Sequence, residues 1–129
     1  MTSDKGSEEP KTRGYKDLIV WQKAMQLVKA IYILTREFPS DERFGLISQM
    51  RRAAVSVASN IAEGQARHST GEFVQFISHA EGSVAELETQ LIIAVDLDFC
   101  SDQAAAPIFG LLLELRKMLN ALRRKLQGR

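Results

Sequence analysis

Two segments of this sequence carry apolar residues at alternating steps of four and three, the spacing of helices that bury one face. The first pattern comprises Phe73, Ile77, Ala80, Val84, Leu87, Leu91 and Ala94. The second comprises Ile108, Leu112, Leu115, Leu119, Leu122 and Leu126. Neither stripe can be buried by its own helix alone, so the chain is restricted to folds in which helices pack on helices.

Two further amphipathic segments precede these, and we expect helices over residues 17–37, 43–65, 71–96 and 102–126. Because the connections are short, neighbouring helices should run antiparallel, which predicts an all-α, up-down-up-down four-helix bundle. The expected N-caps are Asp17, Ser40 or Asp41, Ser69 (in a capping box with Glu72), and Ser101 or Asp102. Gly64 suits a C-terminal cap, and Pro107 should kink the last helix near its start.

The first of these helices carries more apolar surface than a bundle needs. One stripe contains Val20, Ala24, Leu27, Ile31 and Leu34, and a second contains Leu18, Trp21, Met25, Val28 and Tyr32. A bundle helix usually buries one face. We therefore expect part of this helix to face another subunit. In the next helix, Asn60 lies beside small residues and is expected to make a structural hydrogen bond.

The length of 129 residues fits one domain, and 45% of the residues are hydrophobic, enough for a core. Residues 1–14 are polar and read as a disordered tail, which leaves residues 15–129 as the bundle domain. The start is no signal peptide, no run is apolar enough to span a membrane, and Cys100 is the one cysteine. These features predict a protein of the cytoplasm without membrane contact.

Charge is segregated along the chain although the net charge is only +1. Residues 71–115 have a net charge of −8, and residues 116–129 have a net charge of +6. Basic surface of this kind fits an anionic partner, most commonly RNA or DNA. The candidate nucleic-acid-binding residues are Arg51, Arg52, Arg67, Arg116, Arg123, Arg124 and Lys125.

The bases have structural interpretations too. Those of the last helix fit the dipole at a helix C-terminus. Of Arg51 and Arg52, we expect one to be solvated and the other to pair with Glu86 or Glu88 of the acidic third helix.

Few residues point to catalysis. The sequence has two histidines, His68 and His79, and lacks the HExxH, CxxC and Glu-x-x-His motifs of metal sites, the Gly-rich phosphate loop and the nucleophile elbow. We expect no enzyme, no metal and no cofactor. The segment after His79 loosely resembles a histidine-phosphotransfer motif, but Glu81 stands where that motif has a lysine.

Several stretches resemble the small four-helix bundle proteins encoded in intervening sequences of bacterial 23S rRNA genes. They are YKDLIVWQKA at residues 15–24, FP at 38–39, ERFGL at 42–46, SQMRRAAVSVASNIAEG at 48–64, EF at 72–73, GS at 82–83 and ELETQL at 86–91. The resemblance covers about residues 15–125. Ala58 stands where the family often has proline, and Pro107 interrupts a segment that is usually helical.

This resemblance implies a homopentamer with a central channel and no established enzymatic activity. The family is also similar to the accessory variability proteins of diversity-generating retroelements, which bind nucleic acid and a reverse transcriptase. The leading hypothesis is a non-catalytic, homo-oligomeric scaffold that binds RNA or DNA through basic surface. The alternative is a protein-interaction module whose acidic third helix docks a basic partner such as a reverse transcriptase.

Overall fold

The computed structural model describes residues 14–128 and contains four α-helices: α1 (Ile19–Thr35), α2 (Leu46–Gln65), α3 (Thr70–Asp96) and α4 (Asp102–Leu126). Two short 3₁₀ helices, η1 (Gly14–Asp17) and η2 (Ser40–Glu42), precede α1 and α2. Most of the predicted tail, residues 1–13, lies outside the described part, while Gly14 begins η1. The predicted all-α fold is confirmed.

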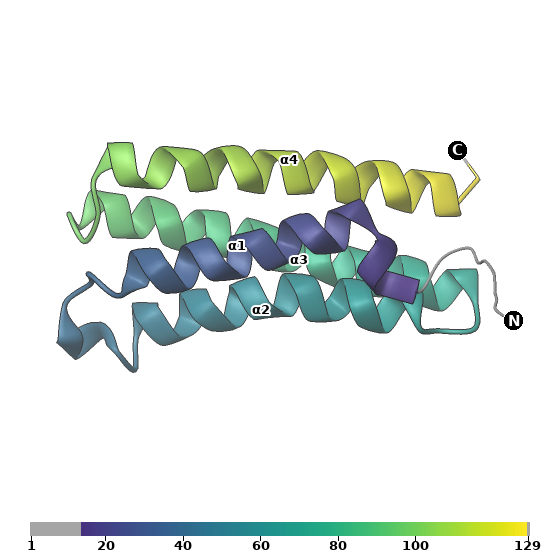
Figure 1. Ribbon diagram of the computed structural model, residues 1–129, viewed down its shortest axis with the longest axis horizontal. Coiled ribbons are helices and arrows are strands. Elements are labelled where there is room, and N and C mark those ends of the chain that lie inside the picture. Colours follow the sequence, from purple (N-terminus) through teal and green to yellow (C-terminus); the bar gives the residue numbers. More distant parts are fainter. Residues whose placement is uncertain (1–13, 129) are drawn as a thin grey trace, which may run out of the picture.

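The helices alternate in direction, and each packs on two neighbours (Figure 1). Helices α1 and α3 each contact both α2 and α4, so the four helices form a closed square around one core. The turn between α2 and α3 lies at the same end of the bundle as η1 and the last turn of α4. The connection from α1 to α2, which contains η2, lies at the opposite end. Within residues 14–128, no helix is long and apolar enough to cross a lipid bilayer.

The heptad-spaced stripes form the core, as predicted. In α3 every member of the stripe from Ile77 to Ala94 is buried, and only Phe73 at the start is partly exposed. In α4 the stripe is buried from Ile108 to Leu119 and becomes half-buried toward the end of the helix. Burial of such apolar side chains is the main favourable contribution to the free energy of folding.

Two of the predicted N-caps are confirmed. The Ser69 hydroxyl accepts a hydrogen bond from the backbone N–H of Glu72 at 3.1 Å, and the Ser101 hydroxyl accepts one from Ala104 at 3.0 Å. Each satisfies a backbone donor that the first turn of a helix leaves without a partner.

The other two predicted N-caps are wrong. Helix α1 begins after Leu18, because Asp17 ends the preceding 3₁₀ turn. Helix α2 begins after Gly45 rather than after Ser40 or Asp41. A residue ahead of the N-cap position takes over the capping role: the Glu42 carboxylate accepts a hydrogen bond from the Leu46 N–H at 3.1 Å.

Gly64 lies inside α2 and is buried, so its predicted role as a C-terminal cap is wrong. A Cβ atom at this position would lie 2.8 Å from Cβ of Phe76 and 2.9 Å from Cδ1 of Phe73. The missing side chain thus lets α2 and α3 approach closely.

A short polar chain links α2 and α3 one level away from Gly64. Asn60 Nδ2 donates to the Ser56 carbonyl at 2.8 Å and to the Ser56 hydroxyl at 3.0 Å. That hydroxyl lies 2.9 Å from the Ser83 hydroxyl of α3. The expected structural role of Asn60 is confirmed.

Pro107 lies within α4, which continues through it from Asp102 to Leu126. Proline lacks the N–H that would bond to the Gln103 carbonyl. Both residues are exposed, so water can take the place of that missing bond. The last helix therefore starts where the sequence predicted.

Candidate nucleic-acid interface

The structure distributes the seven predicted basic residues over separate parts of the bundle. Arg51 and Arg52 lie in the first half of α2, toward the end where α1 connects to α2 (Figure 1). Arg67 lies in the turn between α2 and α3, at the other end of the bundle. The last turn of α4, which carries Arg124 and Lys125, lies at that end too. These residues do not come together in one site.

Two of the α4 arginines pair with acids of α3. Arg123 Nε lies 2.8 Å from Oε1 of Glu81, and both side chains are less than a third exposed. Arg116 Nη1 lies 3.6 Å from Oε1 of Glu88 in a more exposed pair. The two arginines are seven residues apart on α4 and the two glutamates are seven residues apart on α3, so the ion pair repeats along the α3–α4 seam. Two bases of the basic last helix are thereby matched by acids of the neighbouring acidic helix.

The remaining bases of this end are exposed. Arg67 lies over the ring of Phe76 at 4.7 Å, a cation–π contact that leaves its charge in solvent. Arg124 and Lys125 are exposed and lie in the last turn of α4, where the helix dipole favours cations.

Arg51 faces α1, and the expected pairing of Arg51 or Arg52 with the third helix is wrong. Its Nε donates to the Thr35 hydroxyl at 2.9 Å, and its Nη2 donates to the Tyr32 carbonyl at 3.4 Å. The guanidinium also lies 4.5 Å from the centre of the Tyr32 ring. The acids expected to pair are engaged elsewhere: Glu88 with an α4 arginine, and Glu86 with the amide of Gln90, a residue of its own helix.

A hollow of about 440 Å³ lies beside Arg51, between α1 and the start of α2. We call it the arginine–aromatic groove, and it is lined by Tyr32, Arg43, Phe44, Ile47, Ser48, Arg51, Arg52 and Val55. The lining contains three arginines and two aromatic rings but no acidic side chain. Cationic groups beside aromatic rings can bind phosphate and stack on a planar ring.

Sequence reasoning found two of these arginines and missed Arg43, Phe44 and Tyr32. Phe44 is 89% exposed, the largest exposure among the exposed large apolar residues. The Arg43 guanidinium lies 5.8 Å from the centre of its ring. The neighbouring letters RF at 43–44, close before RR at 51–52, are the sequence signal that could have led to the groove.

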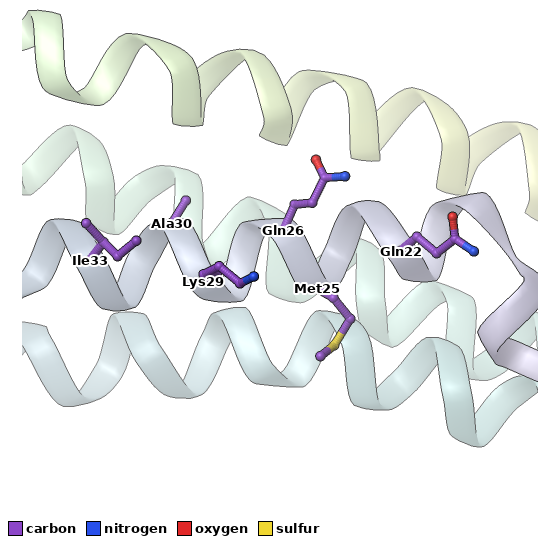
Figure 2. Close-up of a pocket in the computed structure, with 6 residues that line it drawn as sticks. All are labelled: Gln22, Met25, Gln26, Lys29, Ala30 and Ile33. Carbon is purple, nitrogen blue, oxygen red and sulfur yellow. The ribbon is translucent and has the colours of Figure 1, made fainter.

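A second hollow, of about 400 Å³, follows the outer face of α1. Figure 2 shows its lining residues, all from α1: Gln22, Met25, Gln26, Lys29, Ala30 and Ile33. Met25 points toward α2, while Gln26 and Ala30 point toward α4. Of the predicted surplus stripe, Met25 and Tyr32 are exposed, whereas Leu18, Trp21 and Val28 pack partly buried against the core. Ile33, which belongs to neither predicted stripe, is 53% exposed. We call this region the α1 outer face.

The candidate reactive residues lie apart from both hollows. Burial, and then the charge of Asp102, raise the pKa of the Cys100 thiol, which keeps it in its weakly nucleophilic protonated form. His79 is exposed and packs edge-on against Phe76 at 6.2 Å. Within residues 14–128, no three histidine, cysteine or acidic side chains are grouped to hold a metal ion.

The sequence pattern of the family described as 23S rRNA-intervening sequence protein matches residues 16–121 of this chain. The chain belongs to this family. The matched range includes all of α1, α2 and α3, the arginine–aromatic groove and most of α4. It ends before the basic last turn of α4.

The fold of this chain is similar to a solved structure. That structure is the crystal structure of a protein of unknown function from the S23 ribosomal protein family of Bacteroides thetaiotaomicron VPI-5482. The two superpose with a TM-score of 0.77 at 20% sequence identity, over 82% of this chain and 99% of that one. At this identity the likeness supports the bundle fold alone. No curated protein sequence matches the chain.

Proposed function

We propose that this protein is a non-catalytic, homo-oligomeric scaffold that binds nucleic acid through basic surface. The observation that carries the proposal is the arginine–aromatic groove, in which three arginines line one hollow that has no acidic side chain in its lining. Phosphate contacts of arginine supply most of the affinity of nucleic-acid binding, and they are strongest where no carboxylate competes.

The exposed bases at the other end of the bundle are a weaker second contact. Arg67, Arg124 and Lys125 keep their charge in solvent, whereas Arg116 and Arg123 are partly neutralised by acids of α3. In this proposal the groove binds first, and the far end adds salt-sensitive attraction.

Self-association is proposed to use the α1 outer face. Large apolar side chains such as Met25 and Ile33 lie open there around a shallow hollow. Grouped apolar surface of this kind on a small domain marks an interaction site. We propose a pentamer, as the resemblance to the family implies.

The non-catalytic part of the proposal is supported by the state of the reactive residues. The raised pKa of the Cys100 thiol makes it a poor nucleophile, and the exposed His79 contacts an aromatic ring rather than an acid. The alternative, in which the acidic α3 docks a basic partner such as a reverse transcriptase, has less support. Two of the acids it would use, Glu81 and Glu88, already pair with α4.

Light scattering after size exclusion, with and without a generic RNA, tests the proposal. The expected result is one species near five times the 14.4 kDa chain mass, which grows when RNA is added. The double variant Arg43→Ala/Arg52→Ala should keep the oligomer and lose most of the growth. The control is Lys117→Ala, which removes an exposed cation of α4 outside the groove and should leave the behaviour of the natural chain unchanged. A monomer that ignores RNA would end the proposal.

A further inference from the structure

We infer that the arginine–aromatic groove takes single-stranded nucleic acid, with one base stacked on Phe44 and the adjoining phosphates held by Arg43 and Arg52. The inference rests on the proposed function, because it names the strand form and the contacts of the same surface. Charge complementarity and the exposed ring of Phe44 are the two observations behind it.

Phe44 has the position of a stacking platform. Its ring is 89% exposed although it is a large apolar group, so it contributes little to the core of the single chain. The polypeptide beneath it is well fixed, because the Arg43 N–H bonds to the Ser40 carbonyl at 3.2 Å and the Gly45 N–H bonds to the Glu42 carbonyl at 3.0 Å. A ring on a fixed turn loses little entropy when a base stacks on it.

Gly45 follows Phe44 and leaves room for the Glu42 carboxylate. A Cβ atom there would lie 2.9 Å from Oε1 of Glu42, and this oxygen accepts the Leu46 N–H that starts α2. The turn that presents Phe44 is therefore built into the start of the helix that carries Arg51 and Arg52.

The three arginines of the groove have different tasks. Arg51 is tied to α1 by Thr35 and Tyr32, so it forms a fixed, charged wall. Arg43 and Arg52 are exposed, and within residues 14–128 neither has an ion-pair partner. They are free to bind the phosphates on either side of a base that lies on Phe44.

Strand form follows from the ring. The faces of bases inside a duplex are covered by their neighbours, so a duplex could meet only the arginines of the groove. An unpaired base offers its face to an aromatic side chain, and such stacking is tolerant of sequence. Single-stranded RNA and single-stranded DNA should therefore both bind, and more tightly than the duplex.

Fluorescence anisotropy with labelled 12-nucleotide RNA and DNA, each as a single strand and as a duplex, tests the inference. Phe44→Ala should weaken single-strand binding about 5- to 150-fold, the range for one stacked base, and change duplex binding less than twofold. Phe44→Trp should bind as the natural chain does and lose Trp fluorescence on binding. Leu113→Ala, an exposed apolar residue of α4, is the matched control with no effect.

An oligonucleotide with abasic sites separates stacking from charge. The natural chain should bind it no better than Phe44→Ala binds the normal strand. Equal single-strand binding by Phe44→Ala and the natural chain, or preference for the duplex, would overturn the inference while leaving the proposed function intact. Failure of the natural chain to bind any of the nucleic acids would remove both. Circular dichroism of each variant checks that the helices are retained.

Discussion

Two arginines on the α3–α4 seam pair with acids, whereas the arginines of the arginine–aromatic groove, on the α1–α2 side, have no acidic side chain in the lining of their hollow. On the seam, Arg116 and Arg123 are matched by Glu88 and Glu81 at heptad spacing. On the α1–α2 side, Arg51 bonds to the Thr35 hydroxyl and the Tyr32 carbonyl of α1, and these neutral groups leave its charge uncompensated. Arginine charge is thus compensated by carboxylates on the α3–α4 seam and is left without a carboxylate in the groove lining, where it is available to an anionic partner.

The largest contrast is expected between a core leucine and an open isoleucine. Leu115 is fully buried, so Leu115→Ala should lower the free energy of unfolding by about 2–5 kcal/mol at any protein concentration. Ile33 is 53% exposed, so the loss caused by Ile33→Ala should be smaller and should appear only where copies associate. Urea unfolding over a dilution series measures both. A concentration-independent loss of equal size at Ile33 would contradict the contrast.

Arg51 and Arg52 should differ in stability although they are adjacent. Arg51→Ala removes the bonds to Thr35 and Tyr32 and the packing of its stem, so it should cost about 1–2 kcal/mol of unfolding free energy. Arg52 is exposed, and Arg52→Ala should stay within about 0.5 kcal/mol. Chemical denaturation of both variants decides the matter, and equal values would show that Arg51 is not a structural wall of the groove.

The smallest effect concerns the seam of the α3–α4 pair. A double-mutant cycle on Glu81 and Arg123 should give a coupling of about 0.5–1 kcal/mol that falls as salt is added. The longer and more exposed pair of Glu88 and Arg116 should give a coupling near zero. A larger coupling in the second pair would reverse the assignment of which pair holds the seam.

The helices themselves followed from the sequence because the signals for them are local. The spacing of apolar residues in α3 and α4 predicts the buried stripe. A serine just before such a stripe marks the start of the helix, because its hydroxyl can accept from the N–H three residues later. Where the chain enters a helix through a 3₁₀ turn, as at Asp17, the same local signal misleads.

Features made by contact between distant residues could not be predicted in this way. Gly64 resembles a helix cap in the sequence, and only the approach of Phe73 and Phe76 explains it. The arginine–aromatic groove joins Tyr32 of α1 to a turn twelve residues later, so the interleaving of rings and bases exists only after folding. Likewise, the acids that neutralise part of α4 become partners through the register of α3 on α4.

The salt dependence of binding to a single-stranded RNA tests most directly whether nucleic acid binds at the arginine–aromatic groove rather than at α4. The logarithm of the binding constant should fall with the logarithm of salt concentration. Its slope should become shallower by about 1.4 in Arg43→Ala/Arg52→Ala, which loses two phosphate contacts, and remain nearly unchanged in Arg116→Ala/Arg123→Ala. A slope that changes only in the second double variant would contradict the proposal and move the interface to α4.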